Sequence, residues 1–123
     1  MTTTIVDQYC KIVRQLVNYY EKNSDHSDRI KHARQVRLII NETPIYVIES
    51  TGPELYNRKN HIIAGDMQGM IDSENELPDD NETISIITAI LNLWCSTTEE
   101  KRKEITMAFN NLLNLYTRYL IEQ

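Results

Sequence analysis

Residues 84–94 read Ile-Ser-Ile-Ile-Thr-Ala-Ile-Leu-Asn-Leu-Trp, and the polar residues Cys-Ser-Thr-Thr-Glu-Glu follow at 95–100. Wound as a helix, residues 84–94 are apolar around more than half of the circumference, and a helix of that kind is buried by its neighbours. We therefore expect a central buried helix over 82–95 that ends in the polar stretch. Trp94, the only tryptophan in the chain, is expected in the core.

Two long amphipathic helices are expected to pack on this central helix. Apolar residues recur at three- and four-residue spacing over 4–22 and again after residue 100. Thr97 with Glu100 predicts a capping box at the start of the last helix. The apolar face of that helix comprises Ile105, Ala108, Phe109, Leu112, Leu113, Tyr116, Tyr119 and Leu120.

The middle of the chain is less regular. Residues 36–48 fit a β-hairpin, because many of them are β-branched. They also fit two helices that meet at Thr43-Pro44, because proline is favoured in the first turn of a helix, and we prefer the helices. Gly52-Pro53 is expected to break the chain and open another helix, which Gly65 ends.

These patterns predict an all-α protein: a compact, single-domain bundle of about five to seven helices over 1–123, with an exposed acidic loop at 72–82. A chain of 123 residues buries enough surface to fold without a disulfide or a structural metal. Cys10 and Cys95 are expected to be buried free thiols in a reducing compartment. The chain lacks a signal-peptide pattern and an apolar run of about 18 residues, so we expect no membrane span and a cytoplasmic location.

The residues of common metal and catalytic sites do not occur at the required spacing. The acidic loop has carboxylates at alternate positions, but Leu77 and Thr83 stand where an EF-hand needs glycine and a bidentate glutamate. No serine or cysteine lies in a recognised nucleophile motif. We expect no cofactor, no metal ion and no catalytic residue. A small enzyme whose site residues meet only in space is kept as a second alternative.

One cluster of basic residues is present, although the chain has a formal net charge of −5. An acidic protein repels phosphate backbones unless its basic residues gather on one face. The candidate basic patch consists of Arg29, Lys31, Arg34 and Arg37, and it carries the alternative of a nucleic-acid-associated accessory protein. On a helix these charges point in several directions, so a solvated face is preferred, and pairing with the protein's own acidic loop is a further alternative.

The chain contains seven tyrosines and one phenylalanine. Tyrosine combines a large contact area with a polar tip, which suits both core edges and interfaces. Tyr116 and Tyr119 are the candidate interface, because a terminal helix is easily shared with a partner. If they are exposed, we expect a homo-oligomer or a stable complex with a protein partner.

Four motifs follow one another between residues 40 and 120. They are Thr43-Pro44-Ile45, Gly52-Pro53-Glu54-Leu55-Tyr56, His61-Ile62-Ile63-Ala64-Gly65-Asp66, and Leu93-Trp94-Cys95-Ser96 followed by a charged helix with Leu112-Leu113. Together they resemble small uncharacterised all-helical proteins of nucleocytoplasmic large DNA viruses. The resemblance implies a helical fold in the host cytoplasm or the virion, without a mechanism. The sequence as a whole favours a non-enzymatic module for protein–protein interaction, or a structural role.

Overall fold

The computed structural model describes residues 5–23, 27–72 and 82–122. This described part contains seven α-helices and no strand, which confirms the predicted all-α class. None of the described helices combines the length and the apolar composition needed to cross a bilayer. The helices are α1 (Ile5–Lys22), α2 (Ser27–Glu42), α3 (Pro44–Asn57), α4 (Lys59–Ala64), α5 (Met67–Asp72), α6 (Glu82–Ser96) and α7 (Glu99–Ile121).

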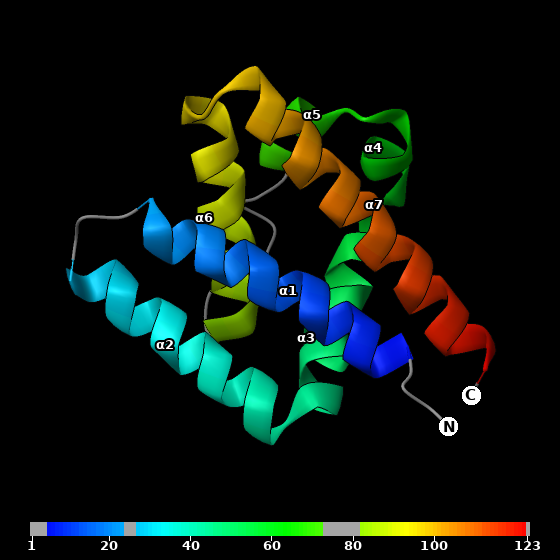
Figure 1. Cartoon of the computed structure of the whole chain (residues 1–123). Coiled ribbons are helices and arrows are strands. Elements are labelled where there is room, and N and C mark those ends of the chain that lie inside the picture. The colour runs from blue at the N-terminus through cyan, green and yellow to red at the C-terminus, as the bar shows by residue number, and fades with distance from the viewer. Residues whose placement is uncertain (1–4, 24–26, 73–81, 123) are drawn as a thin grey trace.

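The long helices form two packed layers (Figure 1). In one layer α1 lies between α2 and α7 and contacts both. The other layer contains α3 and α6, which lie across α1 and contact each other. The short helices α4 and α5 cover one end, where α4 contacts α7 and α5 contacts α6. Because two layers bury their apolar faces against each other, the molecule has one core.

The apolar helix α6 contacts α1, α2, α3, α5 and α7, so it is buried on most sides, as its composition predicts. Its buried side chains are Ile84, Ile86, Ile87, Ile90 and Leu91. The last turn differs, because Trp94 is only partly buried and Cys95 is exposed. The prediction that Cys95 is buried is therefore wrong, and the prediction for Trp94 holds only in part, because its ring packs against the core without being fully buried. Arg102 of α7 covers this turn: its guanidinium lies 4.7 Å from the centre of the Trp94 ring, and it donates hydrogen bonds to the carbonyl oxygens of Trp94 and Cys95.

The other thiol, Cys10, is buried as expected. It donates a hydrogen bond to the carbonyl oxygen of Pro44 at 3.5 Å. Burial raises the pKa of the Cys10 thiol to about 11, so the thiol is protonated at neutral pH.

Residues 36–48 form two helices and not a hairpin. The helix α2 ends at Glu42, and α3 begins at Pro44. Thr43 holds the corner, because its amide and its hydroxyl both donate to the carbonyl oxygen of Ile39, at 2.8 and 2.9 Å. Thr43 occupies the predicted N-cap position of α3, but its side chain stabilises the end of α2 and makes no cap bond to α3.

The predicted break at Gly52-Pro53 is wrong, because α3 continues through both residues to Asn57. A proline inside a helix removes one backbone hydrogen bond and usually bends or ends it. Here the packing of α3 against α1 and α7 keeps the helix intact. Gly52 is buried, and a Cβ atom at this position would overlap the ring of Tyr116. The glycine therefore serves the close approach of α7 and does not end the helix.

Several helix ends lie at or near the positions that the sequence predicts. Gly65 ends α4 in the left-handed conformation, with φ of 71°, as predicted. Thr98 caps α7, accepting from the Lys101 amide, so the predicted cap at Thr97 is off by one residue. The predicted acidic loop lies mostly outside the described residues; its first residue, Asp72, ends α5, and its last, Glu82, begins α6.

Candidate functional site

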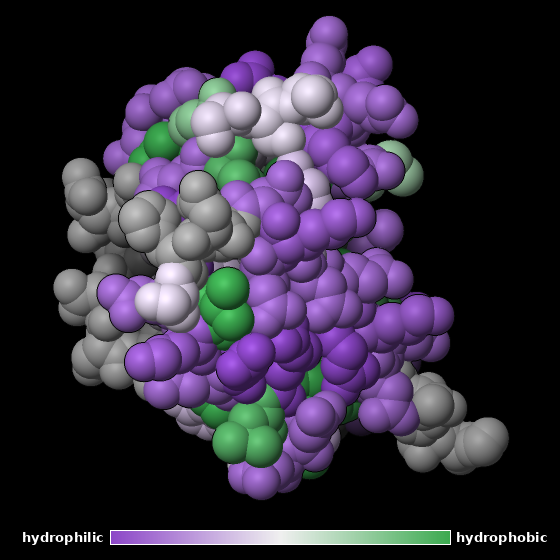
Figure 2. Space-filling model, turned by 60° about the vertical axis from the view of Figure 1, so that its left-hand side comes forward, coloured by the Kyte–Doolittle hydropathy of each residue, from purple (hydrophilic) through white to green (hydrophobic). Residues whose placement is uncertain are grey.

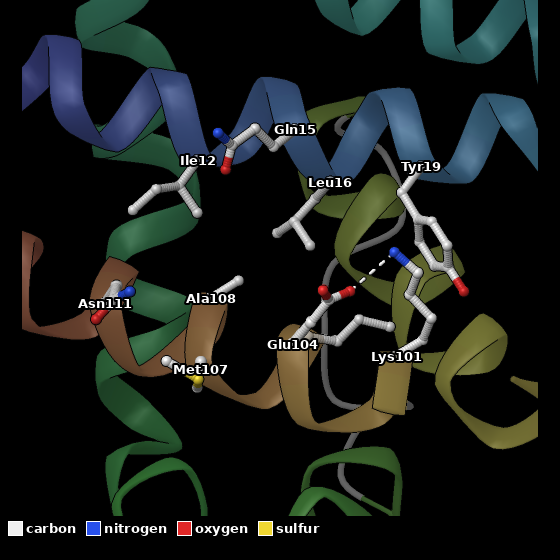
Figure 3. Close-up of a pocket in the computed structure, with 10 residues that line it drawn as sticks. Ile12, Gln15, Leu16, Tyr19, Lys101, Glu104, Met107, Ala108 and Asn111 are labelled. Carbon is white, nitrogen blue, oxygen red and sulfur yellow. Dashed lines mark ion pairs between the residues drawn. The ribbon is translucent and has the colours of Figure 1, made fainter. Parts of the chain in front are cut away.

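A groove runs along the outer seam between α1 and α7. Its more enclosed part, which we call the deep hollow, has a volume of about 390 Å³. Figure 3 shows side chains of α1 and α7 facing each other across it. The hollow is lined by Ile12, Gln15, Leu16 and Tyr19 of α1 and by Lys101, Glu104, Ile105, Met107, Ala108 and Asn111 of α7.

The hollow exists because a small residue stands where two apolar stripes meet. Leu16 and Ile105 are buried and form the floor. Between them and the solvent, α7 presents Ala108, whose single methyl group leaves space that a larger residue would fill. Met107 lies at the same opening with 64 % of its surface exposed. The groove therefore combines an apolar floor with a flexible apolar side chain at its edge.

One end of the groove is closed by polar contacts. The ammonium of Lys101 lies 2.8 Å from the carboxylate of Glu104 and 5.2 Å from the centre of the Tyr19 ring. The Glu104 carboxylate, by its hydrogen bond and its charge, raises the pKa of Lys101. Behind them, the hydroxyls of Tyr19 and Thr97 are hydrogen-bonded at 2.5 Å, which holds α1 to the joint before α7. Figure 3 shows the Lys101–Glu104 pair beside Tyr19 at this end.

The groove continues past the deep hollow in the opposite direction. A second hollow shares Ile12, Gln15 and Asn111 with the first. Its remaining lining consists of Gln8, Lys11, Asn114, Leu115 and Arg118. Side-chain amides and two basic residues thus surround this half, whereas the first half is mainly apolar. We call the two hollows together the α1–α7 groove.

The candidate interface of Tyr116 and Tyr119 lies on the other side of α7, against α3. Tyr116 is buried, so its position gives no support to a role on an exposed contact surface. Tyr119 is half-buried, and its hydroxyl donates to a carboxylate oxygen of Glu49 at 2.8 Å. The Tyr116 ring lies between those of Tyr56 and Tyr119, with centroids 6.3 and 6.4 Å away. Both residues are therefore engaged in the packing between α3 and α7.

The four residues of the candidate basic patch differ in their surroundings. Arg37 is bound to α1, where its two terminal nitrogens donate to the two carboxylate oxygens of Glu21 at 2.8 and 2.9 Å. This bidentate bond lowers the pKa of the Glu21 carboxyl. Arg29, Lys31 and Arg34 remain exposed on α2. Figure 2, which brings forward the left-hand side of Figure 1, shows a mainly hydrophilic face with small, separate hydrophobic areas.

Groups with strongly shifted pKa values lie in the core and not in the groove. Burial raises the pKa of Tyr9, whose hydroxyl is 2.7 Å from that of Thr51, and burial also raises that of Cys10. Within residues 5–23, 27–72 and 82–122, no three His, Cys, Asp or Glu side chains are placed to hold a metal ion. His61 instead bonds Asp66, the N-cap of α5, at 3.1 Å.

The α1–α7 groove was not predicted from the sequence, although a signal was present. Ile12, Leu16 and Tyr19 are spaced as i, i+4 and i+7 along one edge of the apolar stripe of α1. A stripe this wide can serve the core and a second surface at once. Whether this edge of the α1 stripe stays uncovered depends on the size of the α7 residue that faces it. The sequence does not show which residues of α1 and α7 face each other.

Comparisons of the chain with protein-family models, with curated proteins and with solved structures found no match. The geometry of the groove is therefore the basis for the proposed function.

Proposed function

We propose that this protein is a non-enzymatic interaction module that binds a helical segment of another protein in the α1–α7 groove. The observation that carries the proposal is the hollow above the buried side chains of Leu16 and Ile105, which Ala108 and the exposed Met107 border. Amphipathic helices bind such grooves by inserting side chains at i, i+3, i+4 and i+7 between two helices. The binding energy comes from the apolar area removed from water.

The dimensions of the groove suit such a ligand. The lining residues of α1 run from Gln8 to Tyr19, a span of roughly 17 Å at about 1.5 Å per residue. A docked helix of about three turns covers this length. The deep hollow, at about 390 Å³, has room for large apolar side chains. Met107 is flexible and polarizable, which favours adjustment to the shape of a ligand.

The lining of the groove supports binding more than it supports catalysis. Its ionisable side chains are Lys11, Lys101, Glu104, Arg118 and Tyr19, of which Lys101 and Glu104 form an ion pair. General acid–base chemistry uses groups whose pKa values are brought near neutrality. The pKa of Lys101 is moved upward, away from neutrality. The polar groups of the groove are therefore suited to orienting a ligand.

The nucleic-acid alternative has less support from the geometry. Arg37 is committed to Glu21, and the exposed remainder of the basic patch is three residues of an acidic chain. If nucleic acid were the ligand, affinity would fall steeply with added salt and would depend on Arg29, Lys31 and Arg34. We expect no retention of single- or double-stranded DNA in a filter-binding assay at low salt, and salt-sensitive retention would favour this alternative.

A helix selection tests the proposed function directly. Helical peptides are selected from a displayed random library against the full chain, and the bound surface is mapped by amide hydrogen exchange. We expect the enriched peptides to protect residues along the groove in α1 and α7. Met107→Glu places a charge at the opening and is expected to remove binding, while Gln35→Glu on exposed α2 leaves it intact. Selected peptides that protect other surfaces and tolerate Met107→Glu would overturn the proposal.

For the cellular setting we propose the host cytoplasm or the virion, on the basis of the motif resemblance described above. A virion component bound through a groove would be released together with its partner when particles are disrupted under mild conditions. Proteomics of purified virions from an infected culture tests this, and absence of the chain from virions would leave only the cytoplasmic setting.

A further inference from the structure

We infer that the helix bound in the α1–α7 groove is acidic at one end: its apolar side chains enter the deep hollow, and its carboxylates pair with Lys11 and Arg118. This inference rests on the proposed function and specifies the chemistry of the partner. The observation behind it is an uneven distribution of charge along the groove, in a chain whose total charge has the opposite sign.

Within the part of the chain that the structure describes, the lining of the second hollow contains two basic residues and no acidic one. Lys11 projects from α1 and Arg118 from the last turns of α7, and both line the same hollow. Among the described residues, neither of them takes part in an ion pair or a side-chain hydrogen bond. The other lining residues with polar side chains here are the amides Gln8, Gln15, Asn111 and Asn114. A carboxylate arriving at this hollow meets two unpaired cations and several amide donors.

The other end of the groove, at the deep hollow, does not attract a carboxylate in this way. Among the described residues, Lys101 is the only basic residue lining the deep hollow, and Glu104, at 2.8 Å, neutralises it. A second carboxylate at that end would compete with Glu104. Opposite charges across an interface guide orientation and partner choice more than they add affinity. The groove is therefore polarised, with an apolar, neutral half at Leu16 and Ala108 and a basic half at Lys11 and Arg118.

A second copy of this chain is a poor occupant by the same reasoning. A two-fold dimer places the same surface patch on both subunits and needs that patch to be self-complementary. Two grooves that face each other with their ends aligned would bring the Lys11 and Arg118 of both copies together. With their ends reversed, each basic half would meet the neutral half, whose Glu104 is already paired with Lys101. Like charges in contact disfavour an interface. The charge pattern thus fits an acidic partner segment and not a homodimer.

Two matched synthetic peptides test the inference. Both are capped helices of about 14 residues with leucine at i, i+3, i+4 and i+7 spacing. One carries glutamates in the last turn, and the other carries lysines at the same positions. Binding to the full chain is measured by fluorescence anisotropy at low and moderate salt. We expect the glutamate peptide to bind about tenfold more tightly at low salt, with the difference shrinking as salt is added.

Charge-reversal variants test whether Lys11 and Arg118 cause the preference for the glutamate peptide. In the variant Lys11→Glu/Arg118→Glu we expect the lysine peptide to bind more tightly than the glutamate peptide. The control Lys31→Glu/Arg34→Glu changes the net charge equally, on exposed residues of α2, and is expected to keep the wild-type preference. Circular dichroism checks that each variant folds. If Lys11→Glu/Arg118→Glu does not fold, the single variants Lys11→Gln and Arg118→Gln are used, each expected to reduce the preference.

The outcomes separate this inference from the proposed function. If both peptides bind equally, and both lose binding in Met107→Glu, the groove is the docking site but the inference of an acidic partner is wrong. If binding of both peptides is unaffected by Met107→Glu, the proposed function fails as well. A concentration-dependent dimer in light scattering that the glutamate peptide dissociates would identify a second copy as the occupant and overturn the acidic-partner inference.

Discussion

The two seams of α7 are filled in opposite ways. Against α3, the seam is closed: the large ring of Tyr116 is buried on the backbone of Gly52, and Tyr119 is hydrogen-bonded to Glu49. Against α1, the seam is open: Ala108 leaves a hollow of about 390 Å³ above Leu16. One helix thus forms a packed joint on one side and a groove on the other.

This difference follows from the sizes of facing residues. A large ring can be buried between two helices only where its partner helix has no side chain in the way, and Gly52 provides that space. A small residue on one helix, facing medium-sized residues on the other, leaves a gap that the protein's own chain does not fill. We therefore expect changes at the α3–α7 seam to alter stability and changes at the α1–α7 groove to alter binding.

The largest expected effect is the removal of the ring that closes the α3–α7 seam. Tyr116→Ala should lower the free energy of unfolding by about 3–5 kcal/mol, as for other large-to-small core substitutions. Chemical denaturation monitored by circular dichroism measures it. A midpoint close to wild type would show that this seam contributes little, and the comparison of the two seams would fail.

The second effect tests why the seam can close. Gly52→Ala places a Cβ against the Tyr116 ring, and such overpacking costs about 1–3 kcal/mol. Because the cost arises from this one contact, the double variant with Tyr116→Leu should lose less stability than the sum of the two single variants. Strict additivity would mean that the clash lies elsewhere.

The end of α6 gives an intermediate effect. Trp94 is half-buried under Arg102, and its indole nitrogen is buried without a hydrogen-bond partner in the described part of the chain. Trp94→Ala should cost about 2 kcal/mol, less than the 3–5 kcal/mol of a full core deletion. Trp94→Phe removes the unpaired donor and should be close to neutral in denaturant titrations. If Trp94→Phe instead lowers the free energy of unfolding by as much as a full core deletion, the assignment of Trp94 to the core from the sequence would be correct.

A smaller effect is expected from ionisation at the closed seam. Burial, with a contribution from Glu49, raises the pKa of Tyr116 above its ordinary value of 10.0. The unfolded chain then loses this proton more readily than the folded one, so the contribution to stability is complete below about pH 10 and declines as the pH rises further. Stability measured from pH 8 to 11 should fall less in Tyr116→Phe than in wild type. Identical slopes would show that the Tyr116 hydroxyl is not desolvated.

The smallest effect on folding is expected at the open seam. Met107 is 64 % exposed, and Met107→Ala should change the free energy of unfolding by no more than about 0.5 kcal/mol. The same variant should still weaken the peptides that bind the groove. A large loss of stability in thermal denaturation would show that the groove is part of the packed core and not a free surface.

Regular helices with one apolar face were predictable, because their periodicity is local. The predictions for 4–22, 82–95 and the last helix match α1, α6 and α7 within about two residues. The predictions were wrong where packing against another helix overrides what the local sequence favours. Gly52-Pro53 has the composition of a break, but the packing of α3 against α1 and α7 keeps the helix continuous. Cys95 follows an apolar stretch, which is typical of a buried thiol, but in the folded chain it is exposed.

The sequence by itself determined the class, a range of five to seven helices and most of the core, because these follow from hydrophobic spacing and capping residues. Only the tertiary structure decided which faces of α7 meet α1 and α3. That pairing buries Tyr116 on Gly52 and leaves Ala108 facing an open hollow. The physical reason is that spacing along one helix specifies its apolar face, whereas a gap or a close fit depends on the sizes of residues from two helices far apart in the chain.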